Sequence, residues 1–188
     1  TEGAIRIGGA AIDRLNPRVS AAAGIMVIFQ DFSLFPNLTV AENIGFATQM
    51  AEHRRFYNAR DARALARGVL ERIGVDIPVD ARVESLTVAH KQLVAIARAL
   101  ASEARLIIMD EPTTALTERE VRSLLGIIRR LKEDGVAVVF VSHKLAEVLE
   151  VSERVVVLRN GRKVAEGPAA EFDAASLTRH MTGRDVPD

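Results

Sequence analysis

Short apolar runs alternate along this chain with longer segments whose apolar residues recur at helical spacing. The short runs are residues 22–30, 106–109 and 136–142. Each predicts a strand buried in a sheet, because it is brief, continuous and rich in branched residues. Residues 3–9 alternate as a half-buried strand does and end in a Gly-Gly turn. Asn160-Gly161 lies inside residues 153–167 and predicts a β-hairpin, because this dipeptide accepts the left-handed backbone of a tight turn.

The longer segments predict helices with recognisable ends. Thr39 and Glu42, and again Thr117 and Glu120, have the spacing of a capping box, in which each residue bonds the other's backbone N–H. Gly74 and Gly135 are suited to end helices. A further short helix is expected at residues 143–151. The apolar faces are expected to be Ala62, Leu65, Ala66, Val69, Leu70 and Ile73; Leu93, Ile96, Ala97 and Leu100; and Val121, Leu124, Leu125, Ile128 and Leu131.

The order of these elements predicts the fold class. Strands that alternate with helices form a parallel sheet with crossover connections, so the chain is expected to be an α/β protein. Its 188 residues suffice for one sizeable domain. We expect residues 1–44 and 101–188 to form the α/β core and residues 45–100 to form an all-helical subdomain set between strands.

Composition counts against several classes of protein, although a local basic patch is not excluded. Lysine plus arginine equals aspartate plus glutamate at 25 each, so the formal net charge is zero, whereas a dedicated nucleic-acid binder has a basic excess. The chain has no cysteine, hence no disulfide framework and no thiolate metal site. No apolar run reaches the length of a membrane span, and no signal peptide is visible. The first residue, Thr1, indicates that the gene starts further upstream.

Polar residues follow three of the predicted strands. Asp110 and Glu111 end the run at 106–109, Gln30 ends an earlier strand, and His143 follows a later one. Ligands bind at the carboxyl ends of such strands, and two carboxylates there suit a metal ion and an attacking water. Singly, the pair could be a solvated turn, Gln30 a capping residue and His143 a helix-entry residue. Their joint order favours a chemical site.

Four motifs carry a resemblance to a known family. They are "VIFQDFSLFPNLTVAENI", "SLTVAHKQLVAIARALA", "RLIIMDEPTTALTEREV" and "VVFVSHKLAEVLEVSERVVVLRNGRKVAEG". With them the chain, from about residue 1 to about residue 183, resembles the nucleotide-binding cassette of an ABC transporter, and more narrowly that of a sugar importer. The resemblance implies a parallel-sheet P-loop NTPase core of the RecA-like type, with an inserted helical subdomain and a C-terminal β-hairpin.

The resemblance also implies roles for the polar residues. Asp110 resembles the Walker B aspartate that holds Mg²⁺, and Glu111 resembles the glutamate that polarises the attacking water. His143 resembles the switch histidine at the γ-phosphate. Gln30 resembles the Q-loop glutamine, which joins the Mg²⁺ and water network. Residues 114–117 resemble the D-loop, which crosses to a second cassette. The implied cofactors are ATP and Mg²⁺, and the implied chemistry is phosphoryl transfer, with Glu111 and His143 as catalytic residues.

The implied partners are a second cassette, as a homodimer or tandem half, membrane permease subunits and, indirectly, a sugar-binding protein. Nucleic acid is not expected to bind. The implied location is the cytoplasmic side of the cell membrane, to which the cassette would bind peripherally. Candidate permease contacts within residues 31–59 are Phe32, Phe35, Phe46, Phe56 and Tyr57. The alternative for most of these aromatic residues is the core of the helical subdomain.

Two departures from the family pattern qualify these expectations. The phosphate-binding motif G-x-x-x-x-G-K-[S/T] is missing, since no Gly-Lys dipeptide occurs. In the family that motif precedes the strand that residues 3–9 resemble, which indicates truncation before the Walker A segment. We therefore expect these 188 residues by themselves to bind ATP weakly or not at all, and to be inactive alone.

The second departure lies in the nucleotide-binding signature, L-S-G-G-Q in the family and often L-S-V-G-Q in sugar importers. Here Leu86 is followed by Thr87, Val88, Ala89 and His90. Ala89 adds a methyl group where glycine lets backbone approach phosphate, and His90 replaces an amide by a titratable ring. One hypothesis is an impaired, regulatory ATP site in an asymmetric pair. Harmless variation at a tolerant position is the alternative.

Three readings of function therefore remain. The first is the ATP-hydrolysing subunit of a carbohydrate importer. The second is a soluble ABC-type ATPase that acts on nucleic acid or ribosomes, against which the neutral charge counts. The third is a non-catalytic interaction module derived from a cassette, which the missing phosphate-binding motif favours and the retained Glu111 and His143 oppose.

Overall fold

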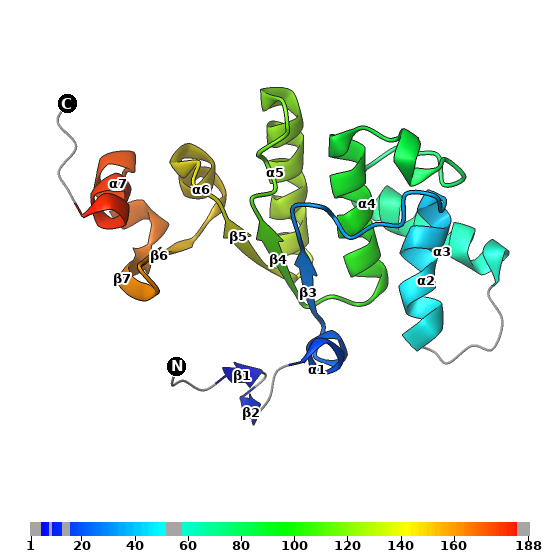
Figure 1. The fold of residues 1–188 in the computed structure, drawn as a ribbon, viewed down its shortest axis with the longest axis horizontal. Helices are drawn as coiled ribbons and strands as arrows, with labels where there is room; N and C mark the ends of the chain where they lie inside the picture. The colour runs from blue at the N-terminus through cyan, green and yellow to red at the C-terminus, as the bar shows by residue number, and fades with distance from the viewer. Residues whose placement is uncertain (1–4, 8, 13–15, 52–57, 184–188) are drawn as a thin grey trace. The chain divides into compact units, whose positions relative to one another are not determined.

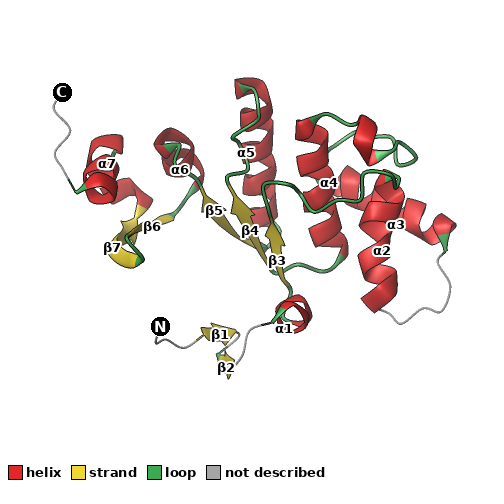
Figure 2. Ribbon diagram, viewed as in Figure 1, coloured by secondary structure: helices red, strands yellow, loops and turns green. Residues whose placement is uncertain are grey.

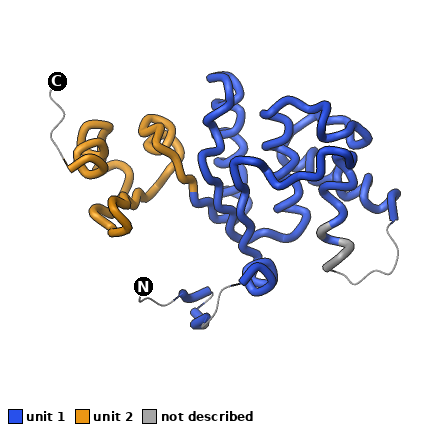
Figure 3. Tube along the Cα trace, viewed as in Figure 1, with its two compact units in different colours: residues 1–139 blue, residues 140–188 orange. Residues whose placement is uncertain are grey.

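A computed structural model describes residues 5–7, 9–12, 16–51 and 58–183 of the chain. The chain divides into two compact units, residues 1–139 and residues 140–188 (Figure 3). Within the described residues, no helix combines the length and the apolarity that crossing a membrane requires.

The centre of the first unit is a parallel sheet of the strands β3 (Ile25–Ile28), β4 (Leu106–Asp110) and β5 (Ala137–Val141), in the order β3-β4-β5 (Figures 1 and 2). The strands β3 and β4 are paired over four residues, from Ile25 opposite Leu106 to Ile28 opposite Met109. The boundary between the units falls inside β5. The acidic strand is therefore central, with the strand that precedes Gln30 beside it.

Two short strands and one short helix precede this sheet in the chain. The strands β1 (Ile5–Ile7) and β2 (Ala10–Ile12) form an antiparallel pair, which confirms a strand within residues 3–9. Helix α1 (Pro17–Ala22) was not predicted. Asn16 caps it by accepting a bond from the Val19 N–H at 3.0 Å, and proline stands in its first turn, where its missing N–H costs nothing.

The helical block contains α2 (Val40–Ala51), α3 (Ala59–Arg72), the 3₁₀ turn Val83–Ser85 and α4 (Val88–Ala101). The capping box predicted at the start of α2 is present, since Thr39 N–H donates to the Glu42 carboxylate at 2.7 Å. Helix α3 ends at a positive-φ glycine, Gly74, as predicted. On its expected face Ala62, Ala66 and Leu70 are buried, whereas Leu65 and Val69 are half-buried.

Helix α5 (Glu118–Glu133) has the strongest apolar stripe, and all five of its predicted stripe residues are buried. Both members of its capping box are in place, and Gly135 follows the helix with a φ of +80°. The end of α5 is tied to the end of α3: Arg130 donates to the Ile73 carbonyl at 3.3 Å, and Arg72 pairs with Asp134 at 2.8 Å. These contacts hold α5 against the helical block.

The sheet corrects one prediction. We expected the three apolar runs to be buried strands, yet none is buried throughout. Val27 of β3 is exposed, Leu106 and Ile108 of β4 are half-buried, and β5 alternates exposed and half-buried residues. Ile107 and Met109 are fully buried, while Val27 is 40% exposed and Val139 is 44% exposed. A continuous apolar run predicts cover on both faces, but the described helices cover one face of the sheet more completely than the other.

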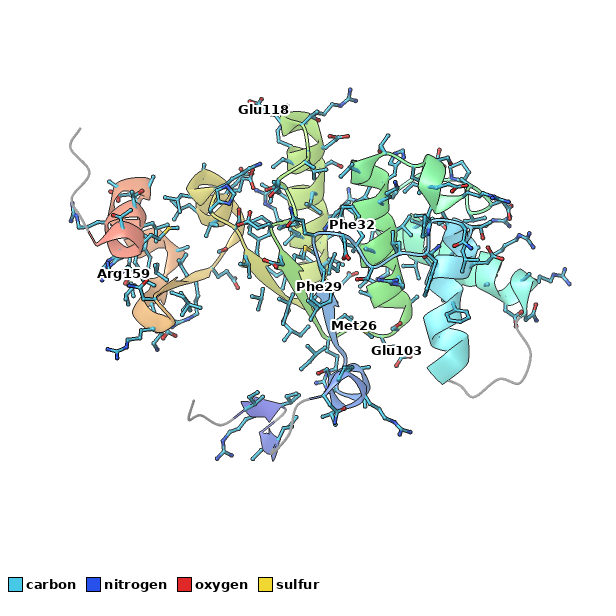
Figure 4. The ribbon with its side chains drawn as sticks, in the orientation of Figure 1. Met26, Phe29, Phe32, Glu103, Glu118 and Arg159 are labelled. Atoms are coloured by element: carbon cyan, nitrogen blue, oxygen red, sulfur yellow. The ribbon has the colours of Figure 1, made fainter. Side chains whose placement is uncertain are left out.

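The second unit holds α6 (Leu145–Val151), the hairpin β6 (Arg154–Arg159) and β7 (Arg162–Pro168), the 3₁₀ turn Ala169–Glu171 and α7 (Ala174–Thr182). The predicted hairpin is confirmed, because Asn160 and Gly161 both have positive φ, at 51° and 73°. Its small core consists of Val155, Val157, Ala169 and Leu177. Arg159, labelled in Figure 4, donates to the His180 carbonyl at 3.1 Å and so ties β6 to α7.

Candidate functional site

Gln30 and the acidic pair lie at the same edge of the sheet. The strands β3 and β4 run parallel and are paired up to Ile28 and Met109, so the residues that come next in both segments emerge at the same edge. Gln30 and Asp110 are exposed, and Glu111 is half-buried. This arrangement places an amide and two carboxylates at the carboxyl edge, where ligands bind in parallel sheets.

Glu111 has a strained backbone. Its φ is +48°, in the left-handed region that residues with a side chain rarely adopt. The turn after it is held by Thr114, whose hydroxyl lies 3.2 Å from the Glu111 carbonyl and 3.3 Å from its carboxylate. Pro112 and Thr113 are buried beneath this turn. Strain that the surroundings hold in place is common at functional sites, because it fixes where a side chain points.

The residues expected to form the D-loop, 114–117, connect this turn to α5. Leu116 N–H donates to the Thr113 carbonyl at 3.2 Å, and Thr117 is the N-cap of the helix. The hydroxyl of Thr117 and the carboxylate of Glu120 lie 2.8 Å apart. The connection from the acidic strand to α5 is therefore short and held by hydrogen bonds.

The first turn of α4 carries the residues that are predicted to form the signature. Thr87 caps this helix, and its hydroxyl accepts a bond from the His90 N–H at 3.2 Å. Thr87, Val88 and His90 are exposed, and Ala89 is half-buried. The segment thus begins a helix, as predicted, and its N-terminal N–H groups are of the kind that bind anions.

A cavity of about 200 Å³ lies between the first turns of α4 and α5. Its polar lining residues are His90, Gln92, Arg119, Glu120 and Ser123, and its apolar lining residues are Ala89, Leu93, Leu116 and Leu124. Hydrogen bonds from the Thr117 backbone and hydroxyl lower the pKa of Glu120, and the charge of His90 lowers this pKa further. The signature turn and the predicted D-loop therefore border one space.

Gln92 is the unusual residue of this cavity. It is 1% exposed, and neither its amide nitrogen nor its amide oxygen has a hydrogen-bond partner among the described residues. Asn43, equally buried, is fully bonded: its side chain accepts from the Phe35 N–H at 2.8 Å and donates to the Phe35 and Thr39 carbonyls. Replacing the Gln92 amide and replacing the Asn43 amide should therefore have different effects on the stability of the fold.

We expect Gln92→Met to leave the free energy of unfolding unchanged or to raise it by about 1 kcal/mol, because an unpaired buried amide carries a desolvation penalty. The matched variant Asn43→Leu should lower the free energy of unfolding by about 1–3 kcal/mol, since it strips partners from buried groups. Urea denaturation measures both. A loss above 1 kcal/mol for Gln92→Met would show that the amide is paired in the folded protein.

The capping box of α5 predicts a pH dependence. Because the pKa of Glu120 is lowered in the folded chain, its contribution is complete above the unfolded value, about 4.3, and is lost as the pH falls through the folded value. Glu120→Ala should therefore lower the Tm at pH 7, and the difference from the unmodified chain should shrink as the pH falls through the lowered pKa of Glu120. Glu118→Ala is the control, since Glu118 lies in the same first turn. A Tm difference for Glu120→Ala that does not decrease as the solution is acidified would contradict this origin.

His143 lies in the second unit, after β5 and before α6, and its side chain is exposed. Its predicted role at a γ-phosphate stays a prediction. No group of three or more His, Cys, Asp or Glu residues that could hold a metal ion occurs in the described part of the chain.

The sequence analysis did not identify two residues that bind the segment after Gln30. Arg98 of α4 donates to two backbone carbonyls just after Gln30, and Asn43 of α2 holds the same segment two residues further on. Both contacts depend on tertiary packing. The signal available in the sequence was a single arginine at position 98 in an otherwise apolar stretch, 94–101.

Comparison with known proteins identifies this site's family. A family model described as "ABC transporter" matches residues 1–114, more than half of the chain. The chain belongs to the ABC transporter family. The family and the α/β fold class predicted from the sequence are thereby confirmed.

Relatives with assigned names place the chain within the ABC family. It is 47% identical over 189 residues to the ribose import ATP-binding protein RbsA 1 of Rubrobacter xylanophilus, covering 99% of this chain and 37% of that protein. It is 43% identical over 187 residues to the RbsA 1 protein of Burkholderia ambifaria, covering 98% of this chain and 36% of that protein. The chain thus spans little more than a third of the length of these relatives.

A solved ABC cassette has the same fold. The dimeric ATP-binding cassette MJ0796, in a post-hydrolysis state bound to ADP and Pi, superimposes with a TM-score of 0.74 at 28% identity. The match covers 90% of this chain and 74% of that one. The described sheet and helices are therefore those of an ABC cassette.

Proposed function

We propose that this chain is part of the ATP-binding and ATP-hydrolysing subunit of a carbohydrate importer, in which closure of a cassette dimer drives a membrane permease. The observation that carries the proposal is the edge where Gln30 and the pair Asp110–Glu111 follow neighbouring parallel strands. The relatives named as ribose import proteins favour a sugar as the transported substrate.

The donor set at this edge suits Mg²⁺. Asp110 supplies a carboxylate and Gln30 an amide oxygen, both exposed and both hard oxygen ligands. Mg²⁺ in nucleotide enzymes takes one or two protein ligands and completes its shell with phosphate and water, so a larger acidic cluster is not required. When bound, the ion would neutralise charge on the phosphates. In the proposal Asp110 and Gln30 hold it.

Glu111 and His143 carry the proposed catalysis. The Glu111 carboxylate, fixed by its strained turn and the Thr114 hydroxyl, would accept a proton from the attacking water. His143 would donate to the γ-phosphate and stabilise the charge there. Both are proposals for phosphoryl transfer, in which positioning and charge neutralisation do most of the catalysis.

The signature residues Thr87, Val88, Ala89 and His90 would bind the nucleotide held by the partner cassette. Ala89 and His90 lie in the first turn of α4, so the added methyl group and the imidazole stand where a phosphate would approach the helix N-terminus. We infer that the ATP site completed by this segment is weakened and acts as a regulatory site. Equal hydrolysis at both sites of the assembled dimer would contradict this inference.

Aromatic residues after Gln30 are the proposed contact with the permease. Phe35 and Phe46 are 49% and 41% exposed, and their rings meet edge to face with centroids 6.0 Å apart. Phe32 is half-buried, while Phe56 and Tyr57 lie outside the described residues. An exposed aromatic pair beside the Gln30 segment suits a protein partner, since aromatic residues are enriched at interfaces. A cassette bound to a permease would lie at the cytoplasmic face of the membrane.

The test is to purify the full-length gene product from membranes of its source cells and to identify what accompanies it. The proposal expects permease subunits and ATP-driven uptake of a sugar, ribose being the first tested, into vesicles that contain the complex. Co-purification with RNA or ribosomes and no permease would replace the proposal by a soluble ATPase. Permease association without ATP hydrolysis would make the chain an interaction module.

A further inference from the structure

The segment that follows Gln30 turns through an unfavourable backbone conformation. Phe32 and Ser33 both have positive φ, at 60° and 47°, although neither is glycine. Local bonds shape this turn: Phe32 N–H donates to the Phe29 carbonyl at 2.9 Å, and Ser33 N–H donates to the Asp31 carboxylate at 3.2 Å. Two successive left-handed residues persist only where surrounding structure holds them.

Arg98, on helix α4, holds this turn in place. Its two terminal guanidinium nitrogens, on helix α4, donate to the Ser33 carbonyl at 2.7 Å and to the Phe32 carbonyl at 3.0 Å. The planar fork of a guanidinium fits two successive carbonyls, which a lysine ammonium cannot match. Burial lowers the pKa of Arg98, but arginine keeps its charge in proteins. Figure 4 labels Phe32 where the chain leaves β3 and passes α4.

The same helix carries the signature residues. Thr87 caps α4 and Arg98 lies near its other end, a separation of about 16 Å at the usual helical rise. Residues 94–97 in the interior of α4 are all buried, so this part of the helix is tightly packed between its two ends. At its C-terminal end the Thr48 hydroxyl donates to the Ala101 carbonyl at 3.2 Å, which fixes that end to α2.

We propose that Arg98 is a positioning residue that holds the strained turn after Gln30 and thereby links the place of Gln30 to the signature helix α4. A movement of the signature turn would reach Gln30 through this fork, without any contact of Arg98 with nucleotide. The catalytic part of this proposal rests on the proposed function, because Gln30 matters for turnover only if the protein hydrolyses ATP.

Hydrogen exchange of single amides tests the hold directly on this chain. In Arg98→Lys, which keeps the charge and loses the fork, the protection of the Phe32 and Ser33 amides should fall about tenfold or more. The Phe35 amide, which Asn43 holds, should keep its protection. Arg130→Lys is the matched control, since Arg130 also donates to a backbone carbonyl of the first unit, that of Ile73. It should leave the Phe32 and Ser33 amides unchanged.

Steady-state kinetics of the full-length gene product tests the consequence. Arg98→Lys should lower kcat for ATP about tenfold and change KM less than about threefold, because the fork affects the placement of Gln30 rather than nucleotide binding. Arg130→Lys should retain the unmodified kcat. Unchanged protection of Phe32 and Ser33 in Arg98→Lys would overturn the proposal, and so would lost protection with unchanged kcat.

The exchange experiment and the kinetic experiment distinguish a failure of this proposal from a failure of the proposed function. If the unmodified gene product hydrolyses no ATP with its permease present, the proposed function fails and the link to catalysis fails with it. The exchange experiment still decides whether Arg98 holds the turn. A uniform loss of protection across the first unit in Arg98→Lys would also overturn the proposal, since it would show a general loss of stability.

Discussion

Glu111→Gln is expected to lower kcat for ATP hydrolysis by about 10²- to 10⁴-fold in the full-length gene product, the range that a positioned general base contributes. The glutamine keeps the size of the side chain and its bond from the Thr114 hydroxyl, but it has no carboxylate to accept a proton. Nucleotide affinity should change little, because the loss concerns the transition state. Phosphate release measured at saturating ATP, together with an ATP titration, checks both parts.

Glu118→Gln is the control for this prediction. Glu118 lies in the first turn of α5 with its side chain 94% exposed, and Figure 4 shows it at the end of that helix. Its substitution should leave kcat unchanged. Activity of Glu111→Gln within a factor of three of the unmodified protein would remove Glu111 from the proposed catalytic role, and equal losses in both variants would indicate an effect of charge alone.

The largest expected effect on stability comes from Ile107→Ala. Ile107 is fully buried in the central strand β4, and truncating such a residue costs about 2–5 kcal/mol through lost burial and the cavity left behind. The neighbouring Ile108→Ala removes the same atoms from the other face of the sheet, where the side chain is half-buried. Its cost should be clearly smaller.

Urea denaturation of both variants of this chain measures the contrast. The two variants are matched in residue type, strand and substitution. The difference between their free energies of unfolding therefore shows how much better one face of the sheet is covered than the other. Equal costs for the two variants would show that both faces are covered in solution. That result would restore the original interpretation of residues 106–109 as a strand buried on both sides.

Local signals predicted the helices well. The capping boxes of Thr39 with Glu42 and of Thr117 with Glu120 mark helix starts in the structure, and Gly74 marks an end. These signals act between residues a few positions apart, so their physics is contained in a short segment. The helix α1 was missed although Asn16 and Pro17 are favourable starting residues, because its apolar pattern is short.

For the candidate site, the residues were identified from the sequence pattern, whereas their roles were not. The sequence indicated Gln30, Asp110 and Glu111 because each follows an apolar run, and parallel pairing brings such ends together. The assignment of roles to them, and to His143, came from the family resemblance and stays a proposal. The exposed residues of β3 and β5 were not predicted. An apolar run indicates that a strand can be buried, but it does not show which neighbouring elements cover each face.

The sequence by itself determined where most helices and strands lie, which family the chain resembles and which polar residues end the central strands. Only the tertiary structure decided that Arg98 reaches the carbonyls of Phe32 and Ser33, some 65 residues earlier in the chain. It also decided that Asn43 is fully bonded while Gln92 has no partner among the described residues. Short-range rules govern the first group, whereas the second depends on how distant segments pack, which no local pattern encodes.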